Sequence, residues 1–190
     1  METFIKSIWA GLCIAIGAIL FLNLGGVVGA FLFSIGLLTI LHFKFKLYTG
    51  VIGYATTYKE LPFILTVIIG NIIGCCLMFA FPTAAAGALV ATKLAAPIWL
   101  VFIKAIICGI LIYVGVEAFK EDRWYITILA VAAFILCGAE HSIADICFFI
   151  SARYFSFESL IFIIVAIIGN AIGSLLIHNL KEGKICVTQD

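Results

Sequence analysis

Charged residues and prolines are scarce in this sequence. Only 11% of its 190 residues are charged, and three are prolines. Because a typical soluble domain carries about 25% charged residues, this composition excludes an ordinary water-soluble domain. A net charge of +1 gives no electrostatic basis for binding nucleic acid. The seven cysteines show neither a CxxC pattern nor a Cys/His spacing typical of metal sites, so we expect no metal and no other cofactor.

Apolar residues, by contrast, are abundant and run through the whole chain. They make up 65% of the sequence, and the mean hydropathy is +1.30. A helix needs about 20 mostly apolar residues to cross a bilayer, which leaves room for six crossings and for no separate soluble domain. We therefore predict an all-α integral membrane protein with a single transmembrane domain over residues 1–190, surrounded by lipid.

Six apolar segments can be separated in the sequence. They cover residues 7–24, 27–57, 62–81, 98–119, 124–150 and 158–180. Residues 82–97 are expected to form a plain connection between the third and the fourth. The second and fifth segments are too long for one regular crossing, and both contain polar residues near the middle, at 42–50 and 138–145. We therefore predict that helices 2 and 5 of the six are broken, near residues 44–50 and near residues 138–141.

An internal repeat divides the chain into two halves. Residues 6–17 match residues 104–115 at an offset of 98. The sequence Ile-Ile-Gly-Asn-Ile-Ile-Gly at 68–74 matches Ile-Ile-Gly-Asn-Ala-Ile-Gly at 167–173 at an offset of 99. Each copy contains three segments, and an odd number of crossings makes the second copy enter the membrane upside down. We predict two inverted three-helix repeats, which cover about 6–81 and 104–180.

The distribution of lysine and arginine predicts how the chain is oriented. If the N-terminus lies in the cytoplasm, the cytoplasmic ends of the segments carry six basic residues: Lys6, Lys59, Lys120, Arg123, Lys181 and Lys184. The opposite side carries Lys93 and Arg153. Because cytoplasmic loops carry the excess of basic residues, we expect both termini to be cytoplasmic.

Three ionisable residues stand in the middle of the fifth apolar segment. They are Glu140, His141 and Asp145. A charge at this depth costs about 2.5–3.5 kcal/mol on insertion scales, so such residues usually face a polar path through the protein. The alternative is a buried polar cluster that only holds helices together. We interpret the cluster as the place where a polar solute crosses.

Several motifs resemble those of a known family. Residues 138–144 read Gly-Ala-Glu-His-Ser-Ile-Ala and resemble the G-x-E-H-S-x-A signature of formate/nitrite transporters. The G-N-x-x-G pattern of that family occurs twice, at 70–74 and 169–173. Residues 47–49, Leu-Tyr-Thr, are similar to its L-F-T loop. The resemblance covers nearly the whole chain.

The resemblance implies an aquaporin-like arrangement that forms a channel. His141 is then the proton donor or anion hydrogen-bond donor at the pore centre, and Thr49 faces it across a slit. The apolar narrowings of the pore would be Phe33, Leu37, Leu47, Tyr48 and Phe134. The resemblance also implies a homopentamer in the inner or plasma membrane, with one pore per protomer.

Other polar residues receive supporting roles. Glu140 is expected to accept backbone N–H bonds and to orient the break rather than to touch substrate. Asn71 and Asn170 are expected to be donors in helix packing. Lys93 and Lys104, near the outer face, would attract anions, although solvated lysines are an equal alternative.

Asp145 departs from the family pattern, in which many members have Asn at this place. It stands one helical turn after His141. We hypothesise that Lys44 or Lys46 folds inward from the second segment and pairs with Asp145. The alternative is that both lysines lie in cytoplasmic water, where they could attract anions, and that Asp145 caps or packs a helix.

The resemblance predicts a channel or transporter for small monovalent weak-acid anions of the formate, nitrite and hydrosulfide class, and not an enzyme. Protonation of the anion near His141 would remove most of the cost of passing an apolar narrowing. Conduction of the bare anion remains open, and protons are therefore a second expected partner. The alternatives are an aquaporin-like channel for a small neutral solute and a membrane scaffold that transports nothing.

Overall fold

The computed structural model describes residues 1–183, and within this range the chain forms helices and no strands. Among these residues, four helical stretches are long and apolar enough to cross a membrane. They are α1 (Glu2–Leu24), α4 (Leu61–Cys75, within the helical stretch Tyr58–Ala80), α6 (Ile98–Lys120) and α9 (Phe157–Lys181). Helices suit such apolar segments because each satisfies its own backbone hydrogen bonds. Lys184, Cys186 and the C-terminus lie outside the described residues.

The ends of these helices follow local sequence signals. Pro97 precedes α6, and Pro62 lies in the first turn of α4, where the missing backbone N–H costs nothing. The start of α9 has a capping box, in which Ser156 Oγ accepts the N–H of Ser159 at 3.1 Å and Ser159 Oγ accepts the N–H of Ser156 at 3.0 Å. For α6 and α9, each boundary expected from the sequence lies within one residue of the boundary in the structure.

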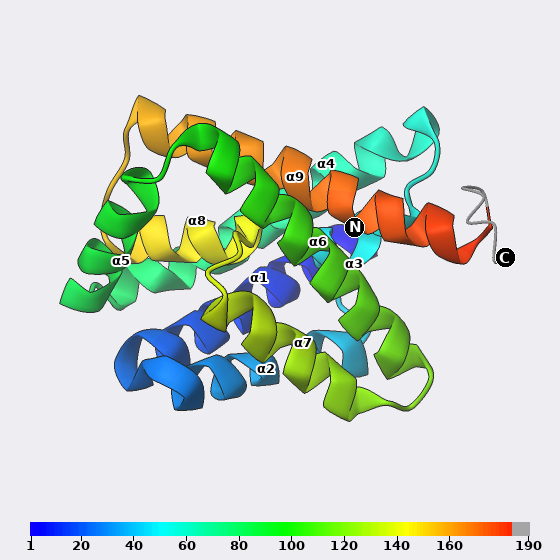
Figure 1. Cartoon of the computed structure of the whole chain (residues 1–190), viewed down its shortest axis with the longest axis horizontal. Coiled ribbons are helices and arrows are strands. Elements are labelled where there is room, and N and C mark those ends of the chain that lie inside the picture. The colour runs from blue at the N-terminus through cyan, green and yellow to red at the C-terminus, as the bar shows by residue number, and fades with distance from the viewer. Residues whose placement is uncertain (184–190) are drawn as a thin grey trace, which may run out of the picture.

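The plain connection expected at 82–97 is wrong, because this stretch contains α5 (Ala84–Leu94). Thr83 caps the helix, and its Oγ1 accepts the N–H of Ala86 at 3.1 Å. Alanine has the highest helix propensity, and an alanine-rich sequence after a capping threonine forms a helix here. In Figure 1, α5 lies beside α8 (Ser142–Ser151), against which it packs.

The second and fifth segments are both interrupted, as the sequence predicts. The second consists of α2 (Gly26–His42) and the single turn α3 (Tyr48–Val51), and the fifth consists of α7 (Trp124–Leu136) and α8. Residues with left-handed backbone conformation lie in both gaps, Lys44 at φ 56° and Gly138 at φ 67°. The helices on either side of each gap are too short to cross a bilayer alone.

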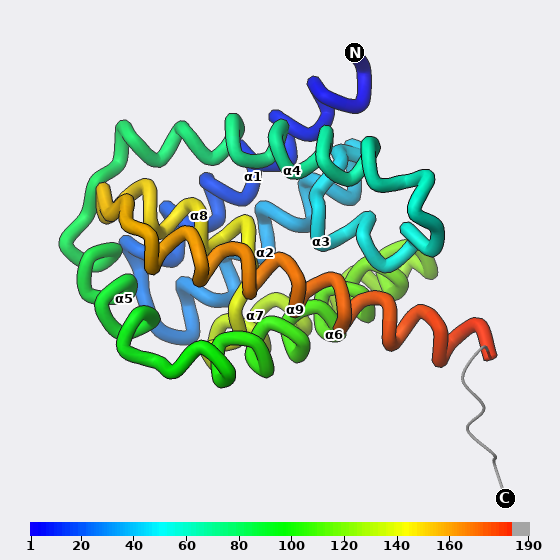
Figure 2. Tube along the Cα trace, turned by 90° about the horizontal axis from the view of Figure 1, so that it is seen from above, coloured from blue at the N-terminus to red at the C-terminus, as the bar shows by residue number. Residues whose placement is uncertain are grey.

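The helices pack as two groups that meet around α8. α1 packs against α2 and α4, and α6 packs against α7 and α9, while α2 and α7 join the groups. Figure 2 shows α4 along one edge and α6 along the opposite edge, with α8 between them. Glycines permit the closest approaches, since a Cβ on Gly11 would overlap the backbone of Asn71, and one on Gly109 the backbone of Asn170.

Asn71 on α4 fixes the first break. Its Oδ1 accepts the backbone N–H of Tyr48, the first residue of α3, at 2.8 Å. Its Nδ2 donates to the carbonyls of Ser7 and Lys46, both at 2.8 Å. One fully buried side chain therefore satisfies three backbone groups and ties α3 to α1 and α4.

Asn170 on α9 makes the same set of bonds at the second break. Its Oδ1 accepts the N–H of Ser142, the first residue of α8, at 2.9 Å. Its Nδ2 donates to the carbonyls of Ala105 and Glu140, both at 2.8 Å. Asn71 and Asn170 therefore act as acceptors as well as donors, and each positions the start of a short helix.

Candidate functional site

His141 occupies the end of the second break and caps α8. Its side chain is buried, with the residue 2% exposed. Nδ1 accepts the backbone N–H of Ala144 at 3.0 Å, and Nε2 lies 2.8 Å from Thr49 Oγ1. A nitrogen that accepts an N–H carries no hydrogen of its own. The neutral imidazole therefore has its proton on Nε2 and donates it to Thr49.

Thr49 reaches His141 from the other half of the chain. It lies in α3, directly after the Tyr48 N–H that Asn71 holds. The structure thus brings together the threonine and the histidine that the sequence motifs single out. Both breaks are required for this contact, because each carries one of the two side chains.

Two phenylalanines lie next to the imidazole. Phe134 on α7 stacks on His141 with ring centroids 5.4 Å apart, and Phe33 on α2 meets Phe134 edge to face at 5.9 Å. Both are buried and line a cavity of about 60 Å³ that His141 also lines. The cavity has room for a solute of a few heavy atoms, and its aromatic wall disfavours a hydrated ion.

The wall of the cavity also carries a buried ion cluster. Lys93 Nζ, at the end of α5, pairs with the Glu140 carboxylate and lies 2.9 Å from Asp145 Oδ1. The lysine side chain is 11% exposed, and the two carboxyl side chains are 2% and 1% exposed. Lys93 and Asp145 line the cavity. Lys93 also lies within 6 Å of the rings of Phe148 and Phe162, at 5.7 and 5.9 Å.

The pairing expected for Asp145 is therefore wrong. Its cation is Lys93, whereas Lys44 and Lys46 line a separate open cavity of about 580 Å³ together with Lys120 and Asp122. The prediction failed because residues 82–97 were expected to be a plain connection, whereas α5 forms there and carries Lys93 inward. The bonding partner expected for Glu140 is wrong as well, because among the described residues its carboxylate accepts from Lys93 and not from backbone N–H groups.

The remaining candidates lie outside the cavity lining. Leu37 and Leu47 are buried in the core, and Tyr48 directs its hydroxyl to the carbonyl of Ile167 on α9 at 2.8 Å. Lys104 contributes its carbonyl, which accepts the N–H of Glu140 at 3.4 Å. Their roles as narrowings or anion attractors stay predictions.

Two aromatic residues of the cavity were missed in the sequence. Phe21 on α1 and Phe148 on α8 both line it, with ring centroids 6.0 Å apart. An apolar residue within an apolar segment gives no sign in the sequence that it lines a cavity. Lys93 could have been noticed, since it is the sole charged residue in 82–97.

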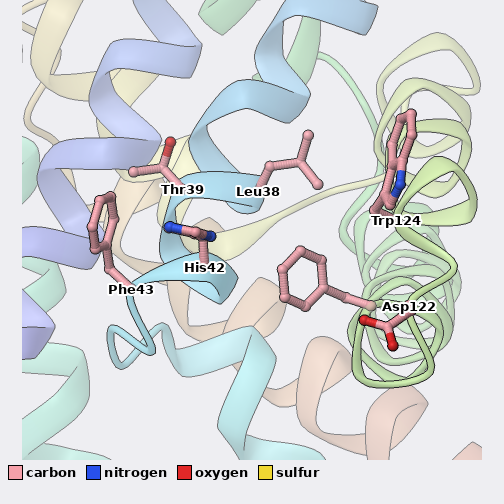
Figure 3. Close-up of a pocket in the computed structure, with 7 residues that line it drawn as sticks. Leu38, Thr39, His42, Phe43, Asp122 and Trp124 are labelled. Carbon is pink, nitrogen blue, oxygen red and sulfur yellow. The ribbon is translucent and has the colours of Figure 1, made fainter.

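A second, open pocket of about 460 Å³ lies at the end of α2. Figure 3 shows Leu38, Thr39 and His42 on one side of it, with Asp122 and Trp124 across the pocket. Its charged residue Asp122 is exposed, in contrast to the buried ions beside His141. We therefore place the candidate functional site in the smaller cavity.

Two solved structures resemble this one along nearly its whole length. One, described as an FNT family ion channel, has a TM-score of 0.84 and 20% sequence identity, and the match covers 96% of this chain and 89% of the other. The second, described as a pentameric formate channel with formate bound, has a TM-score of 0.77 and 21% identity, covering 96% and 94%. At these identities the likeness establishes the fold. No curated protein matches the sequence.

The sequence also matches the model of a known protein family. The family model described as Formate/nitrite transporter matches residues 1–181, which include both breaks and the entire ion cluster. The structural neighbours are likewise channels. The protein is therefore a multi-pass membrane channel or transporter and not an enzyme, and the chain belongs to the formate/nitrite transporter family.

Proposed function

We propose that the protein carries small monovalent weak-acid anions of the formate, nitrite and hydrosulfide class across the inner or plasma membrane. The observation that carries this proposal is the cavity in which Lys93 and His141 lie beside an aromatic wall. A bare anion in a medium of low dielectric constant costs on the order of 20 kcal/mol in the Born limit. Lys93 pairs with Glu140 and Asp145, but its ammonium has three N–H donors, so the third can bind the anion and offset part of that cost. The phenylalanines pass the neutral acid.

Each side chain of the site has a role in this proposal. Lys93 attracts the anion, while His141 and Thr49 form the polar contact at the centre of the path. Phe33 and Phe134 form the narrowing beside the imidazole, which their contacts with each other and with the ring support. Further narrowings are assigned to Leu37, Leu47 and Tyr48. Lysines that would attract anions at the two ends are Lys44, Lys46 and Lys104.

We assign the fold to two inverted three-helix repeats, at about 6–81 and 104–180, within one channel domain over residues 1–190. The matching bonds of Asn71 and Asn170 support this assignment, since each asparagine holds the start of a short helix. In this arrangement α2 with α3, and α7 with α8, each complete one crossing. With the four long helices they make six, which leaves both termini on the same side of the membrane, and the distribution of lysine and arginine assigns that side to the cytoplasm.

A channel for a small neutral solute is the second candidate. The observation in its favour is that both ring nitrogens of His141 are already bonded to the protein. An anion that enters the cavity finds no free imidazole N–H there unless the bond to Thr49 opens. The buried lysine favours the anion nevertheless, because a path for neutral solutes gains nothing from a costly charge.

Uptake by proteoliposomes tests the proposal. Purified protein is reconstituted, and uptake of formate, nitrite, hydrosulfide, acetate and lactate is measured at two pH values, with glycerol and urea as neutral comparisons. We expect at least one weak acid to enter faster than into protein-free liposomes and faster at the lower pH. Uptake of glycerol or urea without uptake of any anion would favour the second candidate.

A further inference from the structure

The cluster beside the cavity holds one more carboxyl group than it has cations. Lys93 is the partner of both Glu140 and Asp145 among the described residues. With every group ionised, this buried cluster would carry a net charge of −1. An uncompensated charge in such a place is costly, and buried groups neutralise by binding a proton. One of the two carboxyl groups is therefore expected to hold a proton.

The contacts of the two carboxyl groups differ in a way that assigns the proton. Glu140 Oε2 accepts a hydrogen bond from Lys93. Asp145 Oδ1 lies 2.9 Å from the same nitrogen, yet neither of its oxygens has a hydrogen bond of acceptable geometry. Its side chain is 1% exposed and lines the cavity, whereas Glu140 is not among the lining residues. The protonated carboxyl is thus Asp145, which faces the space for the solute.

No other group nearby supplies the missing positive charge. Within the described residues, Lys93 from α5 is the one cation within ion-pair distance of Asp145. His141 lies beside Asp145 on the cavity wall in its neutral form. The described thiols near α8 are Cys75, Cys76, Cys108 and Cys147, and a thiol supplies no positive charge in any protonation state. Lys104 Nζ lies beside Gly138, which also lines the cavity, but among the described residues it forms no ion pair with Asp145.

His141 is poorly placed to move the proton itself. Its Nδ1 would have to bind a hydrogen at the position where it now accepts the N–H of Ala144. A protonated Nδ1 would point its N–H at the N–H of Ala144. The hydrogen bond between them would then be lost, and with it the cap of α8. The imidazole is therefore held neutral by the helix that it caps.

We infer that Asp145, and not His141, gives the proton that neutralises the anion in the cavity. This inference rests on the proposed function. The anion enters beside Lys93, the Asp145 O–H bond breaks, and the proton binds the anion, which leaves past Phe33 and Phe134 as the neutral acid. The Asp145 carboxylate, then paired with Lys93, takes up a new proton from water on the side from which the anion came. One proton and one anion cross per cycle.

The decisive variant is Asp145→Asn, which keeps the size of the side chain and removes its acidic proton. Formate uptake and the accompanying acidification are measured together in liposomes that contain a pH-sensitive dye. We expect the wild type to import one proton per formate and to respond little to a potassium diffusion potential. In Asp145→Asn, uptake should fall about 100-fold, lose its pH dependence, and become driven by an inside-positive potential.

Two further variants separate this role from a merely structural one. Glu140→Gln removes the other carboxylate, so Asp145 becomes the sole anionic partner of Lys93 and releases its proton more readily. The pH of half-maximal uptake should then move down by about one unit or more, in contrast to the flat profile of Asp145→Asn. Glu158→Gln, an exposed carboxyl in the first turn of α9, is the matched control and should behave as the wild type.

The outcomes distinguish the inference from the function on which it rests. A wild type that carries no weak acid would contradict both. A wild type that carries formate, beside an Asp145→Asn variant with unchanged proton coupling and pH profile, would overturn the inference alone. An unshifted profile in Glu140→Gln would overturn it as well, because the shared lysine would then not link the two carboxyl groups.

Discussion

The imidazole of His141 joins two elements that are distant in sequence. Through Nδ1 it caps α8, and through the proton on Nε2 it bonds to Thr49 in α3. Both bonds are buried, where a lost partner leaves a polar group without compensation. The residue therefore contributes to the stability of the site as well as to its chemistry.

Two substitutions of His141 are expected to separate these contributions. In His141→Asn the amide oxygen can still cap α8, since Asn is among the preferred capping residues, but it is too short to replace the bond to Thr49. His141→Ala loses both bonds. We expect Ala to unfold more readily than Asn, by about 1 kcal/mol, in thermal unfolding followed by tryptophan fluorescence.

Transport gives the second measurement on the same pair. Both variants should carry formate more slowly than the wild type, while His141→Asn keeps its proton coupling because Asp145 is unchanged. Equal stability of the Asn and Ala variants would contradict the capping role.

Residue-level prediction from the sequence worked where a motif was involved and failed where contact depended on packing. His141 and Thr49 could be paired because each stands in a recognisable motif inside an overlong apolar segment. The partner of Asp145 could not be chosen in this way, because Lys44 and Lys46 were the lysines considered for it and Lys93 was assigned to the outer face. The direction in which α5 projects Lys93 decides the matter, and that direction follows from tertiary packing.

At the scale of elements, the long helices and the two breaks could be predicted, and α5 could not. A continuous apolar segment of about 20 residues carries one strong signal. Helix α5 has only 11 residues, is rich in alanine and is partly exposed, so neither its length nor its hydropathy distinguishes it from a loop. The same weakness of signal hid Phe21 and Phe148, whose neighbours are equally apolar.

Close helix packing yields a prediction at this scale. Gly109 on α6 lies against the backbone of Asn170 on α9, where a Cβ would overlap main-chain atoms that have no room to move. Gly109→Ala should therefore destabilise the protein by about 1–3 kcal/mol. It should also lower transport, because Asn170 holds the first residue of α8.

Gly87→Ala is the control for this substitution. Gly87 lies in α5 with open space around the position of a Cβ. There alanine should be neutral or stabilising, by up to about 1 kcal/mol. Thermal unfolding of both variants in the same detergent checks the pair, and a Gly109→Ala variant as stable as the wild type would show that α6 and α9 can separate freely.

At the scale of the whole molecule, apolar side chains cover much of the surface. Large exposed residues include Trp9, Trp99, Phe155, Phe157 and Leu160. In a membrane such a surface faces lipid or another subunit. The homopentamer implied by the sequence motifs remains our expectation for this chain, and one structural neighbour is described as pentameric.

Native mass spectrometry of the detergent-solubilised protein checks this expectation. The main species should have five times the 20.6 kDa mass of one chain. Because each protomer contains a complete cavity, a pentamer in which one subunit carries Asp145→Asn should keep about four-fifths of the wild-type uptake. A dominant monomer or dimer in several mild detergents would argue against the pentamer.

The single copy of α5 has a consequence for the direction of flow. The breaks and their asparagines occur twice, whereas α5 belongs to the one connection between the halves. Figure 1 shows α5 and α3 toward opposite ends of α8. A solute from the α5 side meets the ion cluster first, and one from the α3 side meets the hydroxyl of Thr49. The energy profile along the path is therefore asymmetric, so equal and opposite concentration gradients should drive unequal fluxes of the solute.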